Sequence, residues 1–151
     1  MRTTRVTLAL AGILAWALAG TVAACGSGSD DGAEAGDGLT VELAEQNGSG
    51  QAGTATFTPR DGGGTRILLE LTNPPLKPQP AHVHDGSCDD LGDPVVPLAN
   101  VVGGRSETDT DLSLDALEGD GLVIHAHKSE SEYDVSVACA PVEREAASIG
   151  Y

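Results

Sequence analysis

Four histidines are the residues of this chain best able to do chemistry, and they come in two pairs with one spacing. His82 and His84 lie in "AHVHDGSC", and His125 and His127 lie in "VIHAHKSE"; the chain has no other histidine. On a β-strand, residues i and i+2 point to the same face, roughly 7 Å apart. If the two strands are neighbours, about 4.8 Å apart, the four imidazoles line one patch. Three or four ring nitrogens could then converge on one metal ion, each at about 2 Å.

Copper is the metal that this pattern favours. Imidazole suits both Cu(II) and Zn(II), and Cu(II) generally binds more tightly. Zinc in its place is the alternative. Either pair alone has a plainer interpretation, because two polar residues facing outward on an exposed strand give the same spacing. The use of every histidine of the chain in two such pairs favours the metal site.

The start of the chain has the pattern of an export signal. Arg2 and Arg5 precede an apolar run, and small residues lead to "VAAC"; the run is too short for a comfortable membrane span. "VAAC" is similar to the lipobox of bacterial lipoproteins, whose cysteine becomes the lipidated first residue. We expect residues 1–24 to be a lipoprotein signal peptide and Cys25 to carry the lipid. Ordinary cleavage near Ala24 and an uncleaved anchor are the alternatives.

The expected export signal implies where the protein is located and whether its other two cysteines are oxidised. The expected location is extracytoplasmic, with the protein anchored to the bacterial cell membrane. Disulfides persist there, so Cys88 and Cys139 are left to pair once Cys25 is lipidated. Such a bridge contributes about 4 kcal/mol in the chain-entropy model. Two free thiols are the alternative, with Cys88 as a further metal ligand.

Acidic residues dominate the charge of the chain. Against 23 Asp and Glu stand eight Lys and Arg, a net charge of −15, which becomes −17 without the two arginines of the signal. Such a surface argues against nucleic acid as a partner and is repelled by anionic lipid headgroups. The lipid on Cys25 is therefore the expected link to the membrane. Residues 25–38, rich in Gly, Ser, Ala and acid, are expected to form a flexible tether.

The segments that must position the histidines have the pattern of strands. Apolar residues alternate along "LTVELAEQ", "AGTATFTPR" and "TRILLELTN", and the intervening "NGSG" and "DGGG" are turn signals. The proline-rich residues 73–80 are expected to cross over in extended form. "PAHVHD", "ETDTDLSL", "GLVIHAHK" and "YDVSVACAPV" are further strand candidates, and "LDALEGDG" a loop or single turn. The pattern predicts an all-β sandwich or flattened barrel over residues 39–151.

Four motifs, in this order, resemble the copper/zinc superoxide dismutase family: "HVHDGSC", "PLANV", "GLVIHAHK" and "SVACAPV". "SGQAGTATFTPRDGGGTRILLELTNPP" is similar to the opening hairpin of that family, and the likeness runs from about residue 39 to 142. The resemblance implies a Greek-key β-barrel or sandwich of about seven or eight strands with shortened loops.

The resemblance also implies roles for individual residues. It makes His82, His84 and His125 copper ligands, and it pairs the same two cysteines in a disulfide. His127 has no counterpart in the family. We expect it either to supply a fourth nitrogen or to point to solvent beside a three-histidine site.

Two features of that family are missing from the sequence. No histidine lies between residues 85 and 124, so neither the bridging histidine nor the family's zinc site is expected, and "DDLGDPVVPLANV" is interpreted as a much shortened loop. The family's arginine that attracts superoxide, three residues before the second cysteine, is Ser136 in this chain. The acidic "KSESEYD" lies close to it.

The sequence therefore leaves three functions open. The first is an enzyme that dismutes superoxide by cycling copper between Cu(II) and Cu(I). The second is a non-catalytic copper-binding or copper-buffering protein, which the two missing features favour. The third is a structural or interaction domain, since "AHVHDGSCDDLGDPVV" also resembles, more weakly, the chordin-type (CHRD) domains.

Overall fold

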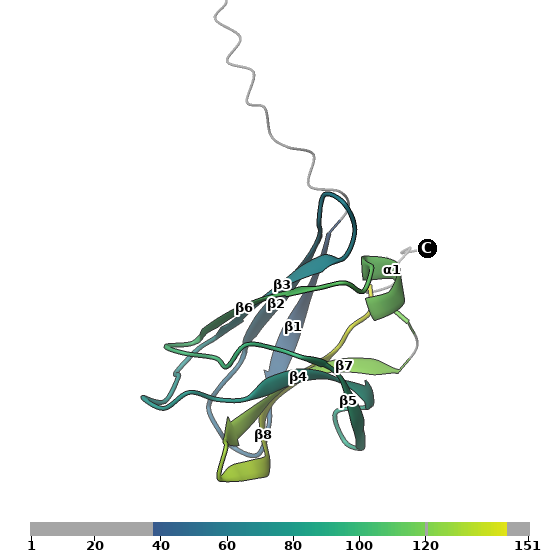
Figure 1. Ribbon diagram of the computed structural model, residues 1–151. Helices are drawn as coiled ribbons and strands as arrows, with labels where there is room; N and C mark the ends of the chain where they lie inside the picture. The colour runs from purple at the N-terminus through teal and green to yellow at the C-terminus, as the bar shows by residue number, and fades with distance from the viewer. Residues whose placement is uncertain (1–37, 120, 145–151) are drawn as a thin grey trace, which may run out of the picture. The chain divides into compact units, whose positions relative to one another are not determined.

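The computed structural model describes residues 38–119 and 121–144, which form eight strands and one short helix (Figure 1). The predicted signal peptide, Cys25, residues 26–37 and the last seven residues lie outside the described ranges. The elements are β1 (Leu39–Glu45), β2 (Gly53–Pro59), β3 (Thr65–Leu71), β4 (Ala81–Gly86), β5 (Leu91–Pro97), β6 (Arg105–Thr110), α1 (Leu114–Leu117), β7 (Leu122–Ser129) and β8 (Glu132–Pro141). Among these elements, no helix has the length and apolar character needed to span a membrane.

The strands form one antiparallel sheet that curls into a nearly closed barrel. Their order is β5-β4-β7-β8-β1-β2-β3-β6. After the hairpin of β4 and β5, the chain crosses to β6 beside β3 and returns to place β7 beside β4, which is the Greek-key arrangement. Figure 1 shows β1, β2, β3 and β6 above β4, β7 and β5. The predicted all-β barrel or sandwich is confirmed.

Alternating apolar residues build the core, as the sequence pattern predicts. The burial of β1 alternates between Leu39, Val41 and Leu43, which are buried, and exposed neighbours. β2 and β3 bury Phe57 and Ile67 opposite each other in the register. Because successive side chains of a strand point to opposite faces, the residues between these buried ones point outward.

Two segments differ from the predictions. "DDLGDPVVPLANV" holds a strand, β5, rather than a loop alone, since residues 91–97 pair with β4 despite two prolines. Proline is tolerated there because β5 is at the end of the sheet and needs only one set of ladder bonds. β6 ends at Thr110, before "LSL", and Ser113 instead caps the single turn α1 by accepting a hydrogen bond from the amide of Ala116.

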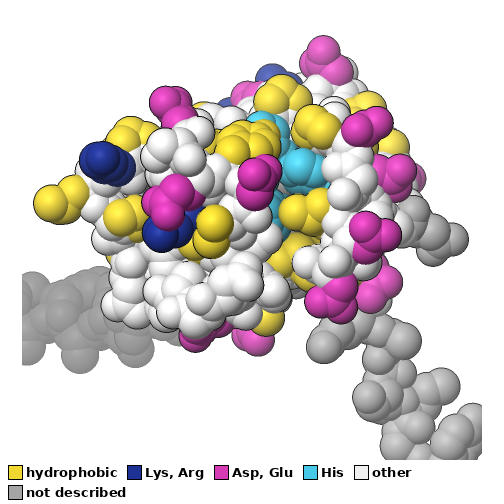
Figure 2. Space-filling view, turned by 90° about the horizontal axis from the view of Figure 1, so that it is seen from below, with side chains coloured by type: hydrophobic (Ala, Val, Ile, Leu, Met, Phe, Trp, Pro, Cys, Tyr) yellow, Lys and Arg dark blue, Asp and Glu magenta, His cyan; other side chains and the backbone are white. Residues whose placement is uncertain are grey.

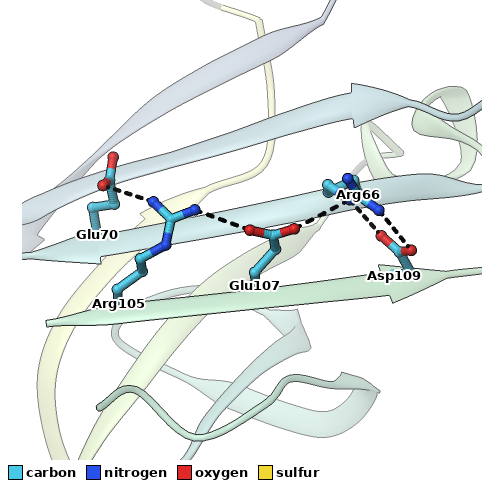
Figure 3. A network of polar contacts seen from close by, with 5 residues as sticks. All are labelled: Arg66, Glu70, Arg105, Glu107 and Asp109. Carbon is cyan, nitrogen blue, oxygen red and sulfur yellow. Dashed lines mark hydrogen bonds and ion pairs between the residues drawn. The ribbon is translucent and has the colours of Figure 1, made fainter. Parts of the chain in front are cut away.

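The other end of the sheet, β6, carries charged side chains on its outer face (Figure 3). Arg66 contacts Asp109 at 2.8 Å and Glu107 at 3.5 Å, while Arg105 contacts Glu107 at 2.9 Å and Glu70 at 3.3 Å. These side chains are exposed, so each pair adds little stability. Their effect is to cover the outside of the β3–β6 ladder with charge.

A disulfide joins Cys88, in the turn between β4 and β5, to Cys139 in β8. The two residues are 51 positions apart in sequence, and their Cα atoms lie 5.8 Å apart. Cys139 is the register partner of His125 on β7. The bridge therefore links the turn after one histidine pair to the strand beside the other, and the predicted Cys88–Cys139 bridge is confirmed.

Candidate metal centre

Strand pairing brings the two histidine pairs together. β4 and β7 are neighbours, and His82 lies directly opposite His125 in the register. Val83, Ile124 and Ala126 point into the core and are fully buried, so the histidines occupy the outer face of the sheet. Figure 2 shows the histidine side chains as one patch, bordered by hydrophobic and acidic side chains. The expected adjacency of the two HxH strands is confirmed.

Three of the four imidazoles form a cluster that could hold a metal ion. His82, His84 and His127 each offer one ring nitrogen, and these atoms all lie within 4.8 Å of one another. His82 Nδ1 and His127 Nε2 are 3.2 Å apart. Two nitrogen ligands at 2.0–2.1 Å from one tetrahedral ion stand about 3.3 Å apart. That pair is therefore already at ligand spacing.

Hydrogen bonds fix which nitrogen of two rings is free. Nδ1 of His84 donates to the carbonyl oxygen of Gly92 at 3.1 Å, and Nδ1 of His127 donates to the carbonyl oxygen of Tyr133. A carbonyl can only accept, so each Nδ1 carries the proton and each Nε2 keeps its lone pair. Nε2 of His84 is buried and has no hydrogen-bond partner. A buried lone pair without a partner fits a metal ligand, and backbone carbonyls that orient such rings are typical of metal sites.

His125 lies beside this cluster rather than in it. Its ring centroid is 4.4 Å from that of His127 and 5.6 Å from that of His84. Nε2 of His125 is 2.6 Å from the hydroxyl of Ser136, while its Nδ1 is buried without a partner. The structure thus groups His127 with the first pair and ties His125 to Ser136. His127 is 3% exposed, so it does not point to solvent.

Burial lowers the pKa of three of these imidazoles and so favours their neutral form. It lowers the pKa of His125 to about 3, helped by the neighbouring rings of His127 and His84. It also lowers the pKa of His127 to about 4, against the hydrogen bond that His127 donates to the Tyr133 carbonyl, which raises it. The pKa of His82 is lowered for the same reason, burial first and then His84. Neutral rings are the form that binds metal ions.

Sequence reasoning missed Tyr133 as a member of the site. Its ring stacks on His127 with 3.9 Å between centroids, and its hydroxyl is 3.2 Å from both ring nitrogens of His82. Two register shifts between β7 and β8, on either side of His127, set this contact. Bulges of this kind re-aim side chains beside functional sites. The only signal in the sequence is an isolated aromatic residue within "KSESEYD".

A hollow of about 600 Å³ lies next to the cluster, not at it. Its walls come from the β7–β8 hairpin, the loop after β1 and the crossover before β4, and Ser136 is among its lining residues. None of the four histidines belongs to those walls. The hollow is therefore separate from the clustered ring nitrogens.

The fold and the site define the class of the protein in general terms. It is an all-β barrel with a disulfide and with a buried histidine cluster that could hold a metal ion. No protein-family model, curated protein or solved structure matches the chain.

Proposed function

We propose that this chain is a lipid-anchored, extracytoplasmic copper-binding protein with one histidine site and no zinc site of the dismutase type. The observation that carries the proposal is the convergence of ring nitrogens from His82, His84 and His127 within 4.8 Å. The buried, unpartnered Nε2 of His84 fits a metal ion because no protein group satisfies it. His125 is the fourth candidate ligand, through its unpartnered Nδ1.

Copper is preferred to zinc on the chemistry of the donors. All the candidate donors are imidazoles, and a nitrogen set of this kind binds Cu(II) more tightly than Zn(II). Zinc in its place remains the alternative where copper is scarce. Bound copper would supply a redox-active centre, and the protein residues would hold it, orient it and limit its contact with water.

Binding or buffering of copper is favoured over catalysis. The chain has a net charge of −15, which attracts a metal cation and repels an anion such as superoxide. At the position of the family's guiding arginine, Ser136 is uncharged and its hydroxyl contacts His125. Neither feature assists an anionic substrate.

Superoxide dismutation is the second candidate. It is supported by the resemblance of the four motifs to the copper/zinc superoxide dismutase family, together with the Greek-key strand order and the bridge from the turn after "HVH" to the last strand. A structural, CHRD-like interaction domain is the third. The partners in this proposal are the membrane, through lipid on Cys25, and superoxide in the catalytic case, with no nucleic acid.

Copper titration of the purified full chain tests the proposal. We expect one Cu(II) per chain, and His→Ala changes at 82, 84 and 127 should weaken binding by orders of magnitude. Arg105→Ala, which removes an exposed cation on β6 at the other end of the strand order, is the control and should leave the affinity unchanged. His125→Ala separates four ligands from three. If the wild-type chain binds neither Cu(II) nor Zn(II), the proposal is wrong. If it binds copper, a superoxide assay of the copper-loaded chain separates binding from catalysis.

The anchor has its own test. Replacing Cys25 with Ser should move the protein from the membrane fraction to the medium. A Cys25→Ser protein that stays in the membrane would instead indicate an uncleaved signal anchor.

A further inference from the structure

Tyr133 contacts two of the three clustered histidines in three separate ways. Its carbonyl oxygen accepts the hydrogen bond of His127 Nδ1, and its ring stacks on that imidazole at an angle of 19°. Its hydroxyl lies 3.2 Å from Nδ1 and 3.2 Å from Nε2 of His82. The side chain is 41% exposed, whereas His127 and His84 are 3% and 5% exposed. Tyr133 thus lies between solvent and the cluster.

The β7–β8 hairpin holds Tyr133 in this place. Lys128 and Glu132 form an ion pair at 2.6 Å across the turn. The hydroxyl of Ser129 accepts a hydrogen bond from the amide of Glu132 at 3.1 Å. Tyr133 directly follows these contacts, so its backbone is fixed at the point where the carbonyl meets His127.

The hydrogen bonds leave one proton arrangement for the metal-free cluster. Because Nδ1 of His127 donates to a carbonyl, its Nε2 is an acceptor, and the group that faces it at 3.2 Å is His82 Nδ1. His82 must then carry its proton on Nδ1. Its Nε2 then keeps the lone pair, and the hydroxyl of Tyr133 lies 3.2 Å from it and equally near Nδ1.

Metal binding reverses this arrangement at His82. Nδ1 is the nitrogen of His82 that faces the cluster, and a nitrogen that bears a proton cannot ligate. The neutral ring must therefore lose the proton from Nδ1 to water and take one up at Nε2, with no net change of charge. A hydroxyl can donate or accept, so Tyr133 can bond to His82 Nε2 in either tautomer.

We propose that Tyr133 is the positioning residue and cover of the metal site, and that its hydroxyl supports the exchange of tautomer at His82 when the metal enters. This inference rests on the proposed metal-binding function. Its carbonyl sets the free nitrogen of His127, its ring holds the plane of that imidazole, and its hydroxyl can accept a hydrogen bond from the N–H that forms at His82 Nε2.

Two variants separate the ring from the hydroxyl. Tyr133→Phe keeps the stack and the backbone bond but removes the hydroxyl, and we expect Cu(II) affinity to fall about 10-fold, as for other partners of metal ligands. Tyr133→Ala also removes the cover, and the fall should approach about 100-fold. Glu130→Gln, at an exposed position of the same hairpin, is the matched control and should bind copper as the wild type does.

Imidazole ¹⁵N spectra of the full chain, metal-free and loaded with Zn(II) as a diamagnetic probe, read the tautomer directly. We expect the proton of His82 on Nδ1 without metal and on Nε2 with it. If wild type binds metal through the histidines but Tyr133→Phe and Tyr133→Ala bind equally well, the role of Tyr133 is refuted and the metal site stands. A His82 proton already on Nε2 in the metal-free chain refutes the exchange. A wild type that binds no metal refutes both proposals.

Discussion

Ser136 is the residue that sets His125 apart from the other three histidines. Its hydroxyl lies 2.6 Å from His125 Nε2, and the ring is 1% exposed. A buried nitrogen that loses its partner carries a desolvation cost of about 1–3 kcal/mol. We therefore expect Ser136 to affect mainly the free energy of unfolding, and the affinity for a metal ion much less.

Ser136→Ala tests this role. We expect the free energy of unfolding of the metal-free chain to fall by about 1–3 kcal/mol, measured by urea denaturation, with copper affinity changed only several-fold. Ser136→Thr keeps a hydroxyl and should lose less stability. A loss of copper affinity as large as that of His84→Ala would contradict the prediction, because it would make His125 a ligand that Ser136 holds in place.

At the scale of the elements, we expect the disulfide to make the largest single contribution to the free energy of unfolding. It connects the turn after β4 to β8 across 51 positions of sequence, and long loops of this kind contribute about 4 kcal/mol. Replacing both Cys88 and Cys139 with Ser should lower the urea midpoint of unfolding accordingly. Reduction of the wild type should have the same effect, and an unchanged midpoint after complete reduction would show that the bridge constrains nothing.

The elements also show what the sequence could and could not predict. The alternation of apolar and polar residues predicted β1, β2 and β3 as strands. The same period of two placed His82 and His84 on one face. The adjacency of β4 and β7 came from the family resemblance and the repeated spacing. The register shifts around His127 belong to the pairing of β7 with β8, and no local pattern in the sequence predicts them. For that reason the sequence did not predict the contacts of Tyr133 or the hydrogen bond between Ser136 and His125.

For the molecule as a whole, buried neutral histidines make the metal-free chain sensitive to acid. Burial lowers the pKa of His125 to about 3 and of His127 to about 4 in the folded chain, while unfolded histidine has a value of about 6.5. Between those values the unfolded chain binds more protons, so stability is full above pH 6.5 and falls as the pH drops toward 4. We expect the thermal midpoint to decrease from pH 7.5 to 5, where carboxylates remain ionised.

The control for that experiment removes the titrating groups. A His125→Gln/His127→Gln variant should show a flatter midpoint over the same range of pH. A wild-type midpoint that stays constant from pH 7.5 to 5 would contradict the prediction, because it would mean that both rings are protonated in the folded chain as readily as in the unfolded one.

The net charge of −15 governs any reaction with superoxide. Like charges slow the approach of the anion, and salt screens this repulsion over a Debye length of about 10 Å at 0.1 M. Turnover by the copper-loaded chain should therefore rise or stay flat as ionic strength increases, measured at fixed pH. A rate that is high at low salt and falls as salt is added would indicate a local guiding field that outweighs the overall charge.

The two edge strands of the sheet, β5 and β6, determine whether neighbouring copies can pair with one another when the protein is concentrated. β5 carries Pro94 and Pro97, which lack the amide hydrogen that a partner strand would need. Along β6, the side-chain hydroxyls of Ser106 and Thr108 bond to the backbone of Ala99, and the backbone of Arg105 bonds to Val102, so the segment before β6 lies against part of this edge. Unprotected strand edges recruit one another when molecules are concentrated. If copies lie side by side on a surface, these two strand edges should not pair with those of a neighbour. The histidine face of each barrel would then stay uncovered by other copies.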